Sequence, residues 1–266
     1  MSERITSLRN DRIKGLIRLI EKSRKRRDSG LFVIEGVREF RLALEGGYIV
    51  DSVFVCPSLS GSGACGGLLR DIRPEICFEV SEAVFSRLAF REGSDGLIAS
   101  AWMKSHSLND LTLSGNPFII VLESLEKPGN LGAILRTAAA AGVDAIIVCD
   151  PLTDVYNLNV IRSSVGCIFS VPLAVASSRE AFAFLRRWDI RIFAAELNAS
   201  SMYYDTDFTG PCAIVMGTEA DGLSAFWLSV SDGRIKIPMC GKIDSLNVSV
   251  STAVITYEAV RQRRRD

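Results

Sequence analysis

The second half of the chain alternates apolar strand patterns with helical patterns, and this alternation constrains the fold more than any other feature. The strand patterns are apolar along nearly their whole length, and they occupy residues 118–123, 144–150, 170–175, 190–196, 212–217 and 234–238. The helices expected between and after them span residues 130–141, 157–166, 178–188, 222–229 and 245–264. Strands without a polar face are typical of parallel sheets that are buried on both sides. The sequence therefore predicts an α/β fold, a parallel sheet with helices on both faces.

The first hundred residues predict a smaller α/β domain. Helices are expected at residues 12–27, 37–47 and 81–90, and strands at 31–36, 51–56, 75–80 and 96–101. The first helix is basic and amphipathic, with an apolar face of Ile13, Leu16, Ile17 and Ile20. A polar stretch follows these elements and is typical of a linker. We therefore expect a small α/β domain at residues 1–105, a linker at 106–116 and a second domain at 117–266.

The composition excludes several classes of protein. With 48% hydrophobic and 23% charged residues over 266 positions, the chain is globular rather than disordered. No apolar run reaches the roughly 20 residues of a membrane span, and the N-terminus lacks a signal-peptide pattern. We therefore expect a cytoplasmic protein that does not associate with a membrane. The seven cysteines form no C-x-x-C pair, which argues against a metal site. The single histidine, His106, is expected to be a solvated linker residue, so chemistry based on histidine is not expected.

Positive charge is concentrated at the two ends of a chain whose net charge is zero. Residues 1–27 contain ten Lys or Arg and three acids, a balance of 10 − 3 = +7, and the basic run "RQRRR" stands just before the last residue. Basic runs are often only solvated helix faces. Two such clusters on a neutral protein also suit a polyanionic partner.

Three polar elements follow predicted strands, where parallel sheets bind ligands. The first contains Asn130, suited to an N-cap or turn, and Arg136, expected close to the inward stripe of its helix, where an anionic ligand would satisfy its charge. The second contains Gly217, Glu219 and Gly222. The third begins at Asp244 or Ser245, either of which could cap the last helix, whose apolar stripe would comprise Leu246, Val250, Ala253, Val254 and Tyr257. Capping does not explain Asn247. Taken singly, each element is also compatible with an ordinary strand–turn–helix junction.

A glycine-rich segment offers a competing pattern. Gly61, Gly63 and Gly66 match G-x-G-x-x-G, the fingerprint of dinucleotide binding. That fingerprint requires the first glycine directly at a strand end and a full helix after it. Here "PSLS" intervenes, and Pro74 ends the following apolar stretch. We interpret this segment as a surface loop.

The three polar elements together resemble the motifs of the SpoU (TrmH-like) family of RNA ribose 2'-O-methyltransferases, in the SPOUT class. The matching stretches are "NLGAILRTAAAAG", "IVMGTEADGLS" and "IPMCGKIDSLNVSVSTAV", and the likeness covers about residues 117–262. The preceding part, with "FVIEGVREFRLALEGG", resembles the ribosomal-protein-like substrate-binding domain of many members. The resemblance implies a C-terminal trefoil knot, a homodimer and S-adenosylmethionine as cofactor.

The resemblance also assigns roles to residues. It places Leu197, Gly217, Ile237 and Leu246 against the cofactor, and it assigns the chemistry to Arg136 with Asn130, Glu219, Ser245 and Asn247. The basic residues Arg12, Arg24, Lys25, Arg26 and Arg27 would bind RNA. The expected substrate is a ribose 2'-hydroxyl, in 23S ribosomal RNA by analogy with the N-terminal domain. A transfer RNA methyltransferase and a non-catalytic RNA-binding or assembly factor remain alternatives, and a dinucleotide-dependent oxidoreductase is a more distant one.

Overall fold

The computed structural model describes residues 3–60, 67–70, 72–90, 94–218 and 221–264, which divide into two compact units. One unit comprises Met1–Lys104 with Asp154–Ser170, and the other comprises Ser105–Thr153 with Val171–Asp266. The segment 154–170, which we expected in the C-terminal domain, therefore belongs to the first unit. The glycines at 61, 63 and 66 lie outside the described residues.

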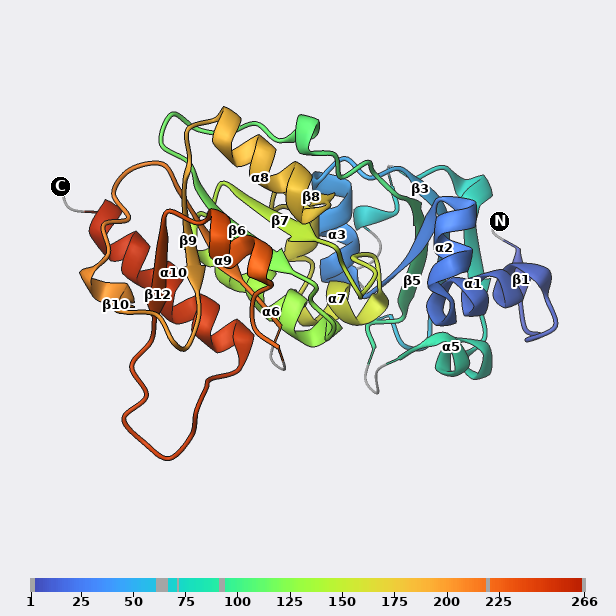
Figure 1. Cartoon of the computed structure of the whole chain (residues 1–266). Helices are drawn as coiled ribbons and strands as arrows, with labels where there is room; N and C mark the ends of the chain where they lie inside the picture. Colours follow the sequence, from blue (N-terminus) through green and yellow to red (C-terminus); the bar gives the residue numbers. More distant parts are fainter. Residues whose placement is uncertain (1–2, 61–66, 71, 91–93, 219–220, 265–266) are drawn as a thin grey trace. The chain divides into compact units, whose positions relative to one another are not determined.

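The second unit is built on a seven-stranded sheet in which every pair of neighbouring strands is parallel (Figure 1). Its order is β10-β12-β9-β11-β6-β7-β8. The strands are β6 (Phe118–Glu123), β7 (Ala145–Cys149), β8 (Leu173–Ala176), β9 (Arg191–Ala195), β10 (Ser201–Met202), β11 (Cys212–Met216) and β12 (Gly233–Lys236). The predicted parallel sheet is confirmed, with β10 as a strand that the pattern did not predict.

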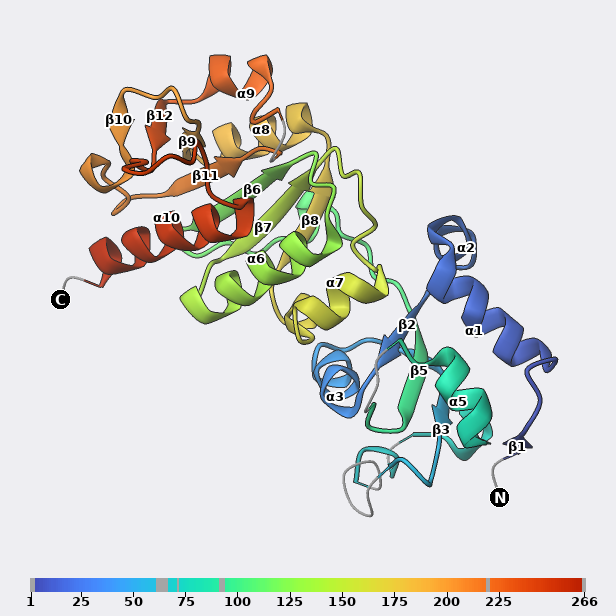
Figure 2. The same cartoon turned by 90° about the horizontal axis from the view of Figure 1, so that it is seen from below.

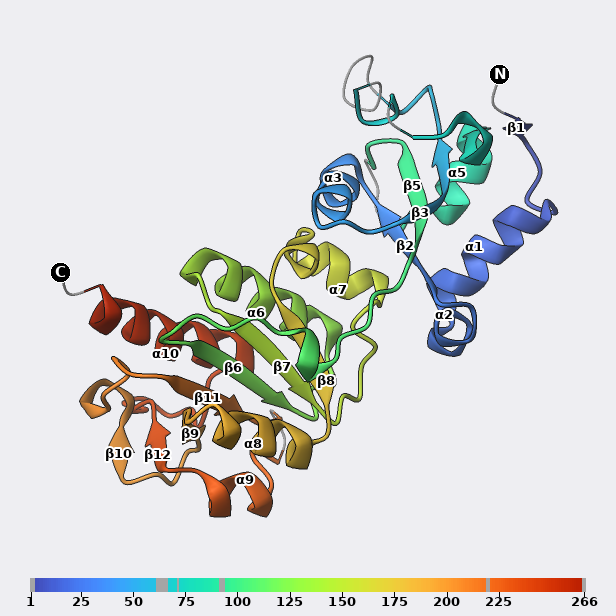
Figure 3. The ribbon, with the colours of Figure 1, turned by 90° about the horizontal axis from the view of Figure 1, so that it is seen from above.

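Helices cover both faces of this sheet, as predicted. They are α6 (Pro128–Ala141), α8 (Ser178–Arg187), α9 (Ala225–Val230) and α10 (Val248–Arg263). Figure 2 shows α6 and α10 side by side on one face, and Figure 3 shows α8 and α9 on the other. Alternate residues of each strand serve the two faces, so Ile119 and Val121 of β6 join Leu185 and Trp227 in one buried cluster.

The first unit contains a mixed five-stranded sheet of order β1-β4-β3-β5-β2. The strands are β1 (Arg4–Ile5), β2 (Leu31–Glu35), β3 (Val50–Val55), β4 (Cys77–Val80) and β5 (Leu97–Trp102), and β5 runs antiparallel to β2 and β3. The helices are α1 (Asp11–Glu21), α2 (Ser23–Ser29), α3 (Val37–Glu45), α5 (Glu82–Leu88) and α7 (Leu158–Ser163). Apolar residues of α1 and α5 pack in one cluster with residues of the strands.

The basic N-terminal segment forms two helices instead of the single predicted helix. Lys22 adopts an extended conformation between α1 and α2. The change of direction buries Arg26, whose side chain is only 3% exposed and forms an ion pair of 2.6 Å with Asp154. Its guanidinium also donates to the carbonyls of Leu19 and Ile20. The prediction that Arg26 binds RNA is therefore wrong, because its donors are used inside the protein.

The predicted linker is part of the second unit. Leu108, Leu111 and Leu113 pack against the buried cluster that contains α8 and α9. His106 is half-buried: its carbonyl accepts from the amide of Val175, and its Nδ1 lies 3.1 Å from the carbonyl oxygen of Leu173. The expectation of a solvated histidine is corrected, because this segment pairs with the edge strand β8.

The buried ion pair generates a stability prediction. Arg26→Ala would leave the Asp154 carboxylate, 12% exposed, without its cation, and we expect the free energy of unfolding to fall by about 3 kcal/mol. Urea denaturation of the full chain measures this change.

Arg24→Ala is the matched control. Arg24 lies on the same helix, and its ion pair at 3.7 Å with Asp28, four residues further along, is on the surface. Surface pairs contribute little, so this variant should unfold like the wild type. Equal, small losses of unfolding free energy in both variants would show that the buried Arg26–Asp154 pair stabilises the protein no more than the surface pair does.

Candidate functional site

A cavity of about 370 Å³ opens at the carboxyl ends of β9, β11 and β12 in the second unit. Such pockets in proteins hold small molecules and cofactors. Its walls come from the last residues of each strand, from the residues that follow them and from the first two turns of α10. They include Ala195, Glu196, Leu197, Asn198, Met216, Gly217, Thr218, Asp221, Leu223, Ile235, Lys236, Ile237, Met239, Ser245, Leu246, Val248, Ser251 and Ile255. The location agrees with the rule that parallel sheets bind ligands at these strand ends.

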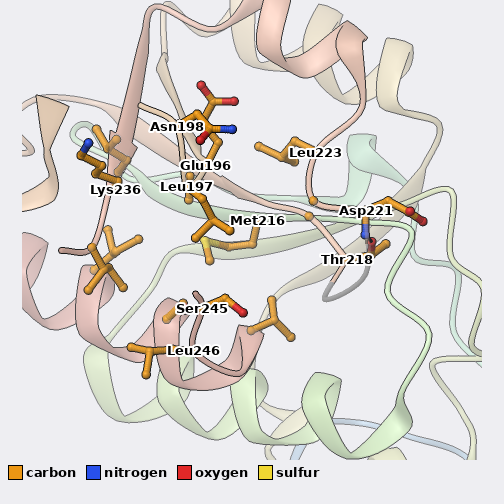
Figure 4. Close-up of a pocket in the computed structure, with 18 of the residues that line it drawn as sticks. Glu196, Leu197, Asn198, Met216, Thr218, Asp221, Leu223, Lys236, Ser245 and Leu246 are labelled. Carbon is orange, nitrogen blue, oxygen red and sulfur yellow. Dashed lines mark hydrogen bonds between the residues drawn. The ribbon is translucent and has the colours of Figure 1, made fainter. Parts of the chain in front are cut away.

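Four residues expected to bind a cofactor line this cavity together: Leu197, Gly217, Ile237 and Leu246. Ser245, expected to take part in the chemistry, lines it as well. Figure 4 shows Leu197 and Met216 in the middle of the cavity, with Ser245 and Leu246 across from them. Segments about fifty residues apart in the sequence therefore converge on one site.

Gly217 is required by the protein's own backbone. A Cβ at this position would overlap the main chain of Gly222 and Leu223. The two ends of this turn are joined by an isolated bridge, in which the amides of Thr218 and Gly222 each donate to the other's carbonyl at 3.0 and 3.2 Å. The absence of a side chain at Gly217 makes room for Gly222, whose φ of +70° is itself in the left-handed region.

The rim of the cavity is polar. Glu196 forms an ion pair with Arg234 at 3.5 Å. Asp221 adds a negative charge and Lys236 a positive one. Apolar residues form the deeper wall, among them Met216, Leu223, Ile235 and Ile255. The site can therefore hold a ligand with an apolar or aromatic body and charged or hydroxyl-bearing ends.

Asn247 is the N-cap of α10. Its Oδ1 accepts from the amide of Ser249 at 3.0 Å and from that residue's hydroxyl at 2.6 Å. The expectation that the helix begins at Asp244 or Ser245 was therefore wrong. Capping does explain Asn247. The predicted apolar stripe of α10 also differs, since Val250 and Tyr257 are 47% and 50% exposed. The helix buries Val248, Thr252, Ile255, Thr256 and Ala259 instead.

Asn130 and Asn247 lie together although 117 residues separate them. The Nδ2 of Asn247 donates to Oδ1 of Asn130 at 3.2 Å, across the contact between α6 and α10. Asn130 is in the first turn of α6 rather than at its N-cap, which is Lys127. Two predicted site residues are thus brought into contact beside the start of α10.

Arg136 is exposed on α6. The expectation that it lies close to the inward stripe, where its charge would need an anionic ligand, was therefore wrong. The inward stripe of α6 is as predicted, with Leu131, Ile134, Leu135 and Ala138 fully buried. Each helical residue is rotated by about 100° from the one before it, so Arg136 lies roughly opposite that stripe. Its guanidinium forms no ion pair with the described residues and needs no ligand to offset burial. Glu219, the remaining predicted site residue, lies outside the described residues.

Glu123 organises the site and was missed from the sequence. This buried carboxylate, at the end of β6, accepts from the amide and hydroxyl of Ser224 at 2.8 and 2.6 Å. Nearby, Ser178 donates to Asp150 at 2.6 Å and accepts from the Trp227 indole at 3.1 Å. These bonds fix the start of α9 and hence the end of the loop that lines the cavity. An acid that ends an otherwise apolar strand was the available signal.

Other expected features belong to the first unit. Arg12, Arg24, Lys25 and Arg27 are exposed on α1 and α2, in contrast to Arg26.

No helix in the described part of the chain has the length and apolar character needed to cross a membrane. Among those same residues, no group of three or more His, Cys, Asp or Glu side chains has a metal-binding arrangement.

Comparison with known proteins adds an independent line of evidence. The model of the SpoU rRNA methylase family matches residues 117–257, and that of the MRM3-like substrate binding domain matches residues 10–99. A 23S rRNA (uridine(2479)-2'-O)-methyltransferase of Streptomyces viridochromogenes is 31% identical over 268 residues, covering 98% of this chain and 93% of that protein.

Two solved structures extend the likeness to the fold. The crystal structure of the SpoU methyltransferase AviRb from Streptomyces viridochromogenes in complex with the cofactor AdoMet is 30% identical with a TM-score of 0.90, covering 97% of this chain and 99% of that one. A crystal structure of an RNA 2'-O ribose methyltransferase is 39% identical with a TM-score of 0.86, covering 98% and 99%. The two family models cover the two parts of the chain for which the sequence analysis stated a resemblance. The chain therefore belongs to the SpoU rRNA methylase family.

Proposed function

We propose that this protein is an S-adenosylmethionine-dependent methyltransferase that modifies a ribose 2'-hydroxyl in ribosomal RNA, most simply 23S rRNA. The observation that carries the proposal is the cavity at the ends of β9, β11 and β12, which is lined by all four residues that the motifs assign to the cofactor. The full-length relatives and the AdoMet complex described above support the same activity.

The chemistry of the cavity fits S-adenosylmethionine. The apolar wall around Leu197, Met216 and Leu246 suits an adenine ring. Carboxylates at the rim can accept from ribose hydroxyls or an ammonium group, and Lys236 can pair with a carboxylate. When bound, this cofactor supplies an electrophilic methyl group on a sulfonium sulfur.

The protein's own residues would position the RNA for in-line transfer. An exposed Arg136 guanidinium is suited to a backbone phosphate, which it can bind with two parallel hydrogen bonds. A guanidinium stays protonated in proteins and is therefore a poor base, so we assign Arg136 to orientation of the ribose. Asn130, Glu219, Ser245 and Asn247 would order the ribose and Arg136 by hydrogen bonding. The hydroxyl proton would then leave through phosphate or water.

The RNA contacts are proposed to begin with the basic N-terminal helices. Arg12, Arg24, Lys25 and Arg27 are exposed and can contribute sequence-independent affinity for phosphates. The match of residues 10–99 to a substrate binding domain supports this assignment. A ribosomal RNA target is favoured over transfer RNA because the full-length relative named above acts on 23S rRNA. Such a target would place the protein in the cytoplasm.

We further propose a homodimer and a C-terminal trefoil knot. β12 pairs with β9 and β10, yet the next helix, α10, packs on α6, so residues 237–247 carry the chain across the sheet's end. That path supports the knot expected for the family. The exposed Val250 and Tyr257 on α10 leave apolar surface for a second copy, and the exposure of Arg136 is compatible with a site completed by that copy.

Methyl transfer can be tested directly with Arg136→Ala. Incubation with labelled S-adenosylmethionine and ribosomal RNA, followed by nuclease digestion, should place the label on ribose 2'-oxygen with the wild type. The variant should transfer about a hundredfold more slowly because the ribose is no longer oriented, while its cofactor affinity stays within a few-fold.

Arg179→Ala is the control, since Arg179 is an exposed helical arginine of the same unit that does not line the cavity. Near-normal transfer by Arg136→Ala would remove this residue from the mechanism. Cofactor binding by the wild type without transfer to any RNA would favour the non-catalytic alternative.

Gly217→Ala tests the cavity itself. The added methyl group would collide with the backbone of Gly222 and Leu223, so the turn must move and the affinity for S-adenosylmethionine should fall about tenfold or more. Calorimetric titration measures the change. Gly241→Ala is matched, because a Cβ at that position meets no atom within 4 Å. Equal affinities in the two variants would place the cofactor elsewhere.

Asn247→Asp separates capping from chemistry. The carboxylate can still accept from the amide of Ser249, so the free energy of unfolding should stay within about 0.5 kcal/mol of the wild type. It cannot donate to Asn130, so transfer should slow about tenfold. Asn247→Ala should lose both stability and transfer. An active Asn247→Asp enzyme would reduce Asn247 to a cap.

A further inference from the structure

A second cavity, of about 320 Å³, lies within the first unit, between α1 and α2 on one side and the strands β2, β3 and β5 on the other. It shares no residue with the cofactor cavity. Its lining residues are Arg12, Gly15, Leu16, Arg18, Leu19, Lys25, Ser29, Leu31, Asp51, Ser52, Phe54 and Ser100. The combination of an apolar base, three cations and one carboxylate is specific enough to ask what would occupy it.

A β-bulge brings two consecutive polar residues of β3 into this cavity. Val50 pairs with Ala101 and Ser52 with Ser100, so Asp51 is an extra residue on β3. In a regular strand Asp51 and Ser52 would point to opposite faces. The bulge turns both toward the cavity, and bulges commonly re-aim side chains next to functional sites.

These residues form a short hydrogen-bonded chain that ends on Asp51. The hydroxyls of Ser52 and Ser100, both buried, lie 2.7 Å apart, and Ser100 donates to Oδ2 of Asp51 at 2.7 Å. The half-buried Asp51 carboxylate accepts no further hydrogen bond from the described residues. One carboxylate oxygen is therefore fixed by the protein, and the other can accept from a ligand.

The cations around the cavity make no ion pair with the described residues. This holds for Arg12, Arg18 and Lys25, whereas Lys14 and Arg24 on the same helices pair with Asp11 and Asp28. The guanidinium of Arg12 lies over the ring of Phe78, with its carbon 4.4 Å from the ring centroid. An arginine supported in this way can present its planar face to a base.

Gly15 keeps the space above α1 open. A glycine in the middle of a helix is unfavourable relative to alanine, and a Cβ built here meets no atom within 4 Å. Packing against neighbouring residues therefore does not require glycine at this position. A larger side chain would instead extend into the cavity that Gly15 lines.

We propose that this cavity holds one unstacked RNA nucleotide whose base carries an exocyclic amino group. The amino group would donate to Asp51, the base would lie against Arg12, and Arg18 and Lys25 would bind the flanking phosphates. A simple anion site would not include the Asp51 carboxylate, and an apolar ligand would not need three cations. This proposal rests on the proposed function only in taking RNA as the ligand, and it adds a site that selects the substrate by base identity.

Asp51→Asn gives a test in which two explanations predict opposite signs. The probes are short oligocytidylate and oligouridylate strands, which differ in that cytosine has an amino donor where uracil has a carbonyl. Fluorescence anisotropy with the full chain should show tighter binding of oligocytidylate. Asp51→Asn should weaken that binding roughly tenfold and abolish the preference. If only net charge matters, removal of a carboxylate should strengthen the binding of both probes, which would overturn the proposal.

Steric and charge variants provide matched comparisons. Gly15→Leu should fill the cavity and remove the preference for cytidylate, whereas Gly15→Ala should keep it. Lys25→Ala should weaken oligocytidylate binding more than Arg27→Ala, which removes the same charge two residues away but outside the cavity. Thermal unfolding confirms that each variant is folded. Preference retained in Gly15→Leu, or equal losses in Lys25→Ala and Arg27→Ala, would contradict a nucleotide in this cavity.

The binding assay contains no cofactor, so its outcome is independent of methyl transfer. Base-selective binding without transfer to any RNA would overturn the proposed function and leave this site standing. Transfer to ribosomal RNA without base selectivity in the Asp51 assay would do the reverse.

Discussion

The loop after β11 is held at both ends by hydrogen bonds, and the proposed cofactor cavity depends on this restraint. At its start, the bridge between Thr218 and Gly222 brings backbone against Gly217, which leaves no room for a side chain. At its end, the buried Glu123 carboxylate binds the amide and hydroxyl of Ser224. The first restraint lies within the turn and the second comes from β6, so both are made by the protein's own residues. Preorganisation of this kind lowers the cost of binding.

Much of this architecture could be predicted from the sequence. Strands without a polar face indicated a parallel sheet covered on both sides. Because such sheets bind ligands at the carboxyl ends of their strands, the sequence also located the cavity, which is lined by Leu197, Gly217, Ile237 and Leu246. The exposure of Arg136 also followed from the predicted stripe of α6, because a rotation of about 100° per residue puts position 136 opposite that stripe. What could not be predicted depends on where helices begin and on distant partners. Asn247 became a cap because α10 begins three residues later than expected. Composition cannot reveal that Arg26 meets Asp154, 128 residues away.

The first unit is not a continuous stretch of chain. Residues 154–170 return to it from the second half and supply Asp154 for Arg26 and an aromatic cluster in which Tyr156 and Phe169 surround Phe32 and Tyr48. A fragment that ended at Lys104 would lose these contacts and leave the Arg26 guanidinium buried without its anion. The proposed RNA-recognition unit and the catalytic unit are therefore joined by two crossings of the chain in addition to the one that a linear domain model predicts.

The central claim is that this chain methylates a ribose in ribosomal RNA. It is tested most directly by mapping 2'-O-methylated positions in RNA from cells with and without the gene. We predict that one ribosomal position loses its methyl group in the absence of the gene and regains it with the wild-type protein but not with Arg136→Ala. An unchanged set of ribose methylations in ribosomal RNA would contradict the account.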